Sequence, residues 1–102
     1  MQIQINTLER QTDNGGVVVV HWRTVETSSQ CTASLYGTES FTPDPTALGY
    51  IPYENLTEAD VVDWLEARWG DVGMAAKQAA LDADILRQSN PPVVSGLPWV
   101  NA

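Results

Sequence analysis

The first part of the chain alternates apolar and polar residues in the manner of β-strands. A mixed segment over residues 3–12 is followed by the turn sequence DNGG at 13–16 and then by the run VVVVHWRTVE. Asn-Gly is the strongest short signal for a β-hairpin, because a type I′ turn requires positive φ at both central residues. We therefore predict an antiparallel hairpin with Asn14 and Gly15 at the centre of its turn.

This turn would set the register of the hairpin, with Ile5 opposite Thr24 and Thr7 opposite Trp22. The face expected to point into the core carries Ile3, Ile5, Val18, Val20 and Trp22. The opposite face is mostly polar and carries Gln4, Asn6, Arg10, His21 and Arg23, together with Leu8, Val19 and Val25. Because side chains alternate with a period of two, a slip of one residue would exchange the two faces.

A third strand is predicted over residues 31–41, after a polar turn. Its expected inward side chains are Cys31, Ala33, Leu35 and Phe41. Gly37 interrupts the strand, which indicates either a β-bulge or a close approach of another group to the backbone.

The pattern then changes to helical spacing. Thr57 is a good N-cap with Asp60 at the N3 position, and Gly70 is a plausible stop. The first helix would present Val61, Val62, Leu65 and Trp69 at helical spacing. A second helix is predicted from about 71 to 88. Its apolar stripe would carry Met74, Leu81 and Ile85, while Ala75, Ala76, Ala79, Ala80 and Ala83 would allow close approach.

Together these patterns predict a single α+β domain over residues 1–102. An antiparallel sheet of three or more strands (1–41) is followed by a Pro- and Tyr-rich connection (42–55), a part with two helices (56–88) and an extended, Pro-rich C-terminal tail (89–102). The core face of the hairpin would be buried against the helices through Leu65, Trp69, Leu81 and Ile85.

Composition narrows the class of protein. The 102 residues include 13 acids and only five Lys and Arg, a net charge of −8, which argues against a nucleic-acid binder. One cysteine allows no internal disulfide, in keeping with a reducing compartment. The N-terminal residues do not resemble a signal peptide, and the longest aliphatic run, 17–20, is far too short to span a membrane. We expect a soluble protein made in the cytoplasm.

Candidate chemistry is sparse, and no catalytic, cofactor-binding or metal-binding residue is assigned. His21 and Cys31 could form a dyad across a strand pair, but the expected register points His21 outward and Cys31 inward. The glycines at 15–16 precede a strand, so they do not form a phosphate-binding loop. The acidic residues suit a solvated helix face better than a metal site, since no calcium-loop spacing is present: Glu54, Glu58, Asp60, Asp63 and Glu66.

The C-terminal tail is the one segment with an unexplained apolar character. Trp99, one of four tryptophans, lies beyond two prolines. It either folds back over its own core, which would avoid an aggregation hazard in a monomer, or anchors a partner. The candidate partner-binding residues are Val93, Val94, Leu97, Pro98, Trp99 and Val100.

Several short motifs taken in order resemble a known group of proteins. They are LER, HWR after a valine run, YGTESFTPDP, IPYENLTEADVVDWLEARWG, and NPP followed by GLPW. Over nearly the whole chain they are similar to an uncharacterised family of small proteins from tailed phages of marine and freshwater bacteria, cyanophages among them. The resemblance implies a virion or virion-assembly protein and carries over no catalytic residue. The ending is also weakly similar to the tails of phage tail-fibre assembly proteins, although the long polar linker of those proteins is missing.

We therefore expect a non-enzymatic structural protein of a tailed-phage virion, at the head, neck, tail or fibre. It would be made in the host cytoplasm and bind other virion proteins, as a homo-oligomer or in many copies, without nucleic acid or membrane. Two alternatives stay open. One is an assembly chaperone absent from the mature particle, and the other is an acidic host-directed inhibitor that mimics nucleic acid.

Overall fold

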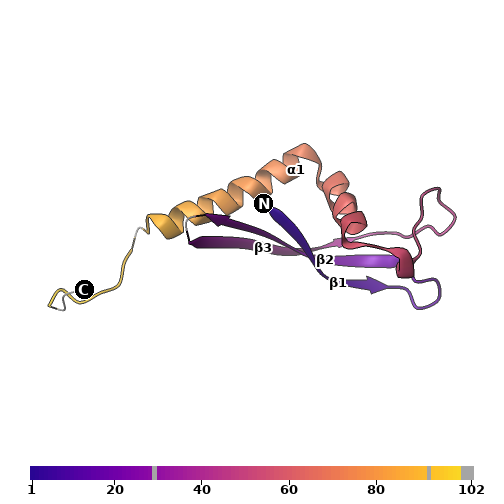
Figure 1. The fold of residues 1–102 in the computed structure, drawn as a ribbon, viewed down its shortest axis with the longest axis horizontal. Coiled ribbons are helices and arrows are strands. Elements are labelled where there is room, and N and C mark those ends of the chain that lie inside the picture. Colours follow the sequence, from indigo (N-terminus) through magenta and orange to yellow (C-terminus); the bar gives the residue numbers. More distant parts are fainter. Residues whose placement is uncertain (29, 92, 100–102) are drawn as a thin grey trace.

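The computed structural model describes residues 1–28, 30–91 and 93–99, which form three strands followed by one long helix. In chain order these elements are β1 (Gln2–Arg10), β2 (Val17–Ser28), β3 (Cys31–Ser40), a short 3₁₀ helix η1 (Tyr53–Asn55) and α1 (Glu58–Ser89). The strands form one antiparallel sheet in the order β1-β2-β3, and α1 lies across one of its faces (Figure 1). The predicted α+β class and the three-stranded antiparallel sheet are confirmed.

The hairpin turn is longer than the predicted two-residue turn. Gln11 N donates to Gly16 O at 2.8 Å, and Gly15 N donates to Gln11 O at 2.9 Å. Gly15 has a φ of 71°, but Asn14 does not share this conformation and instead accepts from Gly16 N through its side-chain oxygen at 2.8 Å. The type I′ prediction is therefore wrong, because the Asn14 side chain closes a wider loop.

The wider turn and a bulge in β1 together overturn the predicted register. Ile5 pairs with Trp22 rather than with Thr24. The pairing then shifts by one residue between Ile5 and Thr7, so that Asn6 is the bulged residue. An inserted residue reverses which side chains of the strand point inward. Leu8, predicted on the polar face, therefore packs against the core together with Ile5.

A second bulge, at Val18 in β2, has the same effect on the valine run. The pairing of β1 with β2 skips Val18, and Val17 is buried in its place with 5% of its surface exposed. The alternation then continues as predicted, with Val20 and Trp22 buried. The buried cluster consists of Val17, Val20, Trp22, Val61 and Leu65.

Gly37 in β3 lies directly under an indole ring. It pairs with Trp22 without any shift in register, so the bulge alternative is wrong and the close-approach alternative is confirmed. A Cβ at this position would overlap the six-membered ring of Trp22. Ala33 is buried as predicted, while Leu35 and Phe41 are partly buried against the core.

Helix α1 begins where the sequence predicts, and its backbone leaves the helical conformation at the predicted stop, Gly70. Thr57 Oγ1 accepts from Asp60 N at 3.2 Å, and Asp60 Oδ2 accepts from Thr57 N at 3.0 Å, which completes a capping box. Gly70 adopts φ 66° and ψ −177°, a conformation open essentially to glycine alone. The two predicted helical segments correspond to the two arms of α1, which bends at Gly70 and arches over the sheet (Figure 1).

Both arms of α1 bury side chains against the sheet. Leu65 and Leu81 are buried, whereas Trp69 and Ile85 remain half-buried. The five alanines expected to allow close approach are instead exposed: Ala75, Ala76, Ala79, Ala80 and Ala83. In the described part of the chain, no helix has the length and apolar character needed to cross a membrane.

Candidate interaction site

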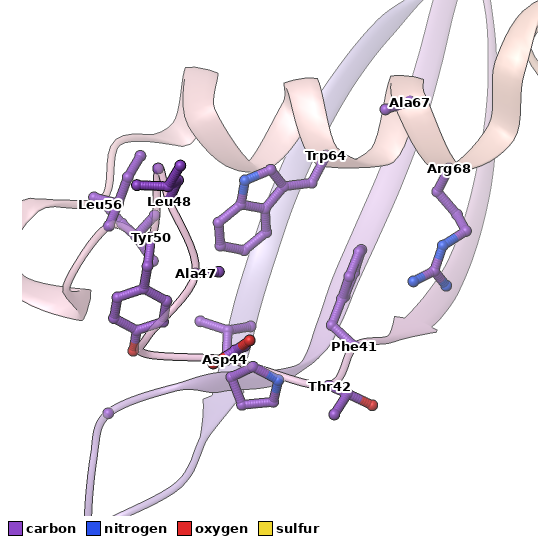
Figure 2. A pocket seen from close by; sticks show the side chains of 15 residues that line it. Phe41, Thr42, Asp44, Ala47, Leu48, Tyr50, Leu56, Trp64, Ala67 and Arg68 are labelled. Carbon is purple, nitrogen blue, oxygen red and sulfur yellow. The ribbon is translucent and has the colours of Figure 1, made fainter.

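The main pocket lies at the end of the sheet where α1 begins. Residues 41–51, which follow β3, curl under the first turns of α1 and close against the hairpin turn, leaving a cavity of about 560 Å³ (Figure 2). This volume is in the range of ~300–1,000 Å³ typical of ligand sites. Its apolar walls include Phe41, Pro43, Leu48, Tyr50, Leu56 and Trp64.

A side-chain-stabilised turn shapes the loop that forms the outer wall of the pocket. Asp44 Oδ1 accepts from Thr46 Oγ1 at 2.6 Å and from Thr46 N at 3.0 Å. Ala47 N donates to Asp44 O at 3.0 Å and closes the turn. The hydrogen bonds from the Thr46 hydroxyl and then from its backbone amide lower the pKa of Asp44, so the turn is built on the ionised carboxylate.

An aromatic pair forms the inner wall. The rings of Phe41 and Trp64 lie 5.8 Å apart at 54°, and the Trp64 indole extends from α1 into the space between Leu48 and Phe41 (Figure 2). The guanidinium of Arg68 lies 4.3 Å from the centre of the Phe41 ring. It also donates to Glu39 Oε2 at 3.2 Å and to a β3 carbonyl at 3.0 Å. These contacts fix the rim of the pocket on the last residues of β3.

The start of α1 is held in place from three directions, which positions Trp64. Beyond the capping box, Glu58 Oε2 accepts from Ile5 N at 3.2 Å across the β1 bulge. The Arg10 guanidinium lies 3.8 Å from the centre of the Tyr53 ring and links the hairpin to η1. These contacts join the hairpin to the connection and to the start of α1 at this end of the molecule.

Two lining residues are unusual for a closed domain. The Leu48 side chain has its full surface exposed, with a relative exposure of 104%. The Tyr50 hydroxyl is buried and has no hydrogen-bond partner among the described residues. An apolar occupant would remove the Leu48 side chain from water, and one with a polar group near Tyr50 could also pair with its hydroxyl.

The described tail residues 93–99 lie at the opposite end of the molecule from the pocket, and none of them lines it (Figure 1). Trp99 is 77% exposed, so the alternative in which it folds back over its own core is wrong. Val93, Val94 and Leu97 are exposed by 81%, 79% and 56%, and Pro98 is exposed as well. Val100, the last candidate partner-binding residue, lies outside the described residues.

The structure does not bring His21 and Cys31 together. His21 pairs with Thr38 in the sheet and binds Glu9 Oε2 through Nε2 at 2.6 Å. Cys31 lies at the other end of β3, where its Sγ is 3.6 Å from Ser89 Oγ. The distance in register between the two residues contradicts the Cys-His dyad.

The two acidic residues in the first turn of α1 have structural partners. Glu58 and Asp60 accept from backbone amides, as described above. Within residues 1–28, 30–91 and 93–99, no three or more His, Cys, Asp or Glu side chains gather in a way that could hold a metal ion.

The sequence indicates the apolar residues of the tail but not the pocket. The prolines and tyrosines of residues 42–55 predict only an irregular connection. The signal that could have found the pocket is the density of apolar residues there, at Leu48, Tyr50, Ile51 and Tyr53, in a segment with no strand or helix to bury them.

One comparison with known proteins gives a match. A family model described as Domain of unknown function (DUF7936) matches residues 1–99. No curated protein and no solved structure shows significant similarity to the chain.

Proposed function

The chain belongs to the DUF7936 family, and we propose that it is a non-enzymatic interaction protein that binds other proteins of a larger assembly through its C-terminal tail. The observation that carries this proposal is the exposure of Val93, Val94, Leu97 and Trp99 on an extended segment. Large apolar side chains, tryptophan above all, contribute most to protein–protein binding once they are desolvated by a partner.

The assembly in this proposal is the virion of a tailed phage. The order of motifs over nearly the whole chain, which resembles small tailed-phage proteins, supports this choice. An apolar tail beyond a folded domain also suits a virion subunit, because such a tail can cover a neighbour's surface without rearranging the domain. The protein would be present in several copies with other virion proteins as partners.

Deletion of residues 93–102 tests the role of the tail. We expect the truncated protein to keep its fold, because the described residues of this segment are exposed and make no hydrogen bond to the domain. Circular dichroism and thermal unfolding should match those of the full chain. The truncated protein should be missing from purified, salt-washed virions when copies per particle are counted by mass spectrometry.

Two outcomes would contradict the proposal. A truncated protein that unfolds would make the tail part of the core, and one that enters virions at full copy number would remove its anchoring role. If the full chain is abundant in infected cells but absent from particles, the protein acts during assembly as a chaperone or against a host target, and the structural role is wrong.

A further inference from the structure

We propose that the tail of one copy binds in the apolar pocket of a second copy, with Leu97 and Trp99 inserted beside Phe41 and Trp64. This inference rests on the proposed function of the tail as an anchor and names its receptor. The same chain would then carry both halves of a head-to-tail contact.

The pocket suits an apolar and uncharged occupant. Its walls are aromatic and aliphatic, with the exposed Leu48 at the rim and the Phe41–Trp64 pair inside. Only two lining residues carry charge, Asp44 and Arg68, and their charges are opposite. Both are already engaged, Asp44 by Thr46 and Arg68 by Glu39, so neither requires a charged group from a ligand.

The tail has matching properties. Residues 90–99 contain no charged side chain, in a protein whose net charge is −8. Two such acidic molecules repel each other, and a contact between a neutral tail and a neutral pocket keeps this repulsion low. Prolines at 91 and 98 favour an extended backbone, the form in which Pro-rich segments bind to aromatic-lined grooves.

The geometry favours a second copy over the molecule's own pocket. The part of α1 between Arg68 and Ser89 spans ~30 Å at 1.5 Å per residue. Residues 90–99 reach at most ~35 Å when fully extended. The chain's own tail would have to turn back and run along the whole arm of α1 without slack, whereas it leaves α1 away from the pocket (Figure 1).

A contact of this kind joins different surfaces on the two partners. Each copy would offer a free pocket at one end and a free tail at the other, so that copies add until a ring closes or a filament grows. The pocket and the tail would thereby form the repeated contact of a multi-copy assembly.

Two variants separate the halves of the contact. Leu48→Glu places a charge at the rim of the pocket, at a position whose full exposure leaves the fold unaffected. Deletion of 93–102 removes the tail and leaves the pocket. Val72→Glu is the matched control, because Val72 is 85% exposed on α1 and belongs to neither half.

Sedimentation velocity over a range of concentrations measures the association. The full chain and Val72→Glu should associate as concentration rises. Leu48→Glu alone and the truncated protein alone should stay monomeric, and Trp99→Ala should weaken association about tenfold or more. A mixture of Leu48→Glu and the truncated protein should form a 1:1 complex and nothing larger, since only one tail and one intact pocket can meet.

Three results would overturn the inference. They are a full chain that stays monomeric, a Leu48→Glu variant that associates like the control, and a mixture that forms no complex. Counting copies of each variant per virion distinguishes a failure of this inference from a failure of the proposed function. If truncation removes the protein from particles while Leu48→Glu does not, the tail is an anchor for another virion protein, and the pocket is not its receptor.

Discussion

Thr24 in β2 is the one fully buried polar side chain among the described residues, and its hydroxyl has no hydrogen-bond partner there. Thr24→Val replaces this hydroxyl with a methyl group of similar size. We expect the free energy of unfolding to rise by about 1 kcal/mol, because burial of an unpaired hydroxyl is costly. Urea unfolding monitored by tryptophan fluorescence measures the change.

Thr38→Val is the matched control, because Thr38 lies in the neighbouring strand with its side chain exposed. Its free energy of unfolding should change by less than about 0.5 kcal/mol. A Thr24→Val variant that is destabilised would mean that the hydroxyl has a partner that matters for stability.

The pocket loop depends on pH through Asp44. Hydrogen bonds from the Thr46 hydroxyl and amide lower its pKa below the ordinary value of 3.8. A lowered pKa in the folded state means that this carboxylate stabilises the loop above that value and ceases to do so as the pH falls through its folded pKa. NMR titration of the side-chain carboxyl should give a pKa below 3.8. Thr46→Ala should move the pKa back towards the ordinary value, and an unchanged pKa in that variant would contradict the assignment of its cause.

At the level of elements, the contact between Gly37 and Trp22 fixes the middle of the sheet. The Trp22 ring is buried and also contacts the Trp69 ring, at 4.9 Å and 71°, and so has little room to move. Gly37→Ala should therefore lower the free energy of unfolding by about 1–3 kcal/mol through overpacking. Gly96→Ala, with open space around it, should have no measurable effect in the same urea titration. Equal stability of the two variants would show that the indole can shift freely.

The bend of α1 gives a prediction of a different kind. A Cβ at Gly70 would meet no atom within 4 Å, so only the backbone opposes a larger residue there. Gly70→Ala should cost about 1–3 kcal/mol, because the conformation at this position is strained for any L-residue. Thermal unfolding followed by calorimetry measures this loss. A variant as stable as the parent chain would indicate that the two arms can realign into a straight helix without cost.

The elements themselves could be read from the sequence, but their registers could not. Thr57, Asp60 and Gly70 act locally, through caps and backbone preference. Thr57 and Asp60 lie at the predicted start of α1, and Gly70, the predicted stop, lies at its bend. The bulges at Asn6 and Val18 have no local signal. They arise because Leu8 and Val17 gain burial under the first arm of α1, a tertiary effect that overrides strict alternation.

At the level of the whole molecule, the long sheet, α1 and the tail that continues beyond them give an elongated shape (Figure 1). The dimensions are 69 × 27 × 18 Å and the radius of gyration is 19.0 Å, against ~13 Å for a compact domain of this length. Small-angle scattering of the dilute monomer should give a value near 19 Å for the full chain and a clearly smaller one after deletion of 93–102. Equal values for the full chain and the truncated protein would mean that the tail folds back in solution.

The apolar residues of the connection signal that this segment must be covered, but the sequence could not predict the pocket walls, because they belong to no single segment. Phe41 and Trp64 meet only when β3, the connection and α1 are assembled, and the sequence places them more than twenty residues apart. The tail, in contrast, was visible in the sequence, since residues 90–99 combine apolar side chains with prolines that oppose strand and helix. The local composition thus indicates the tail side of the proposed contact, whereas the pocket side forms only through long-range packing.

The bend at Gly70 also affects the local unfolding of α1. A non-helical residue interrupts the regular series of backbone hydrogen bonds, so the two arms of α1 can open as separate units. The first arm carries Val61 and Leu65 of the main buried cluster, whereas the second relies on Leu81. Amide hydrogens beyond the bend would therefore exchange with solvent sooner than those before it. The arm that carries the tail could loosen, and re-aim the tail, while the pocket stays intact.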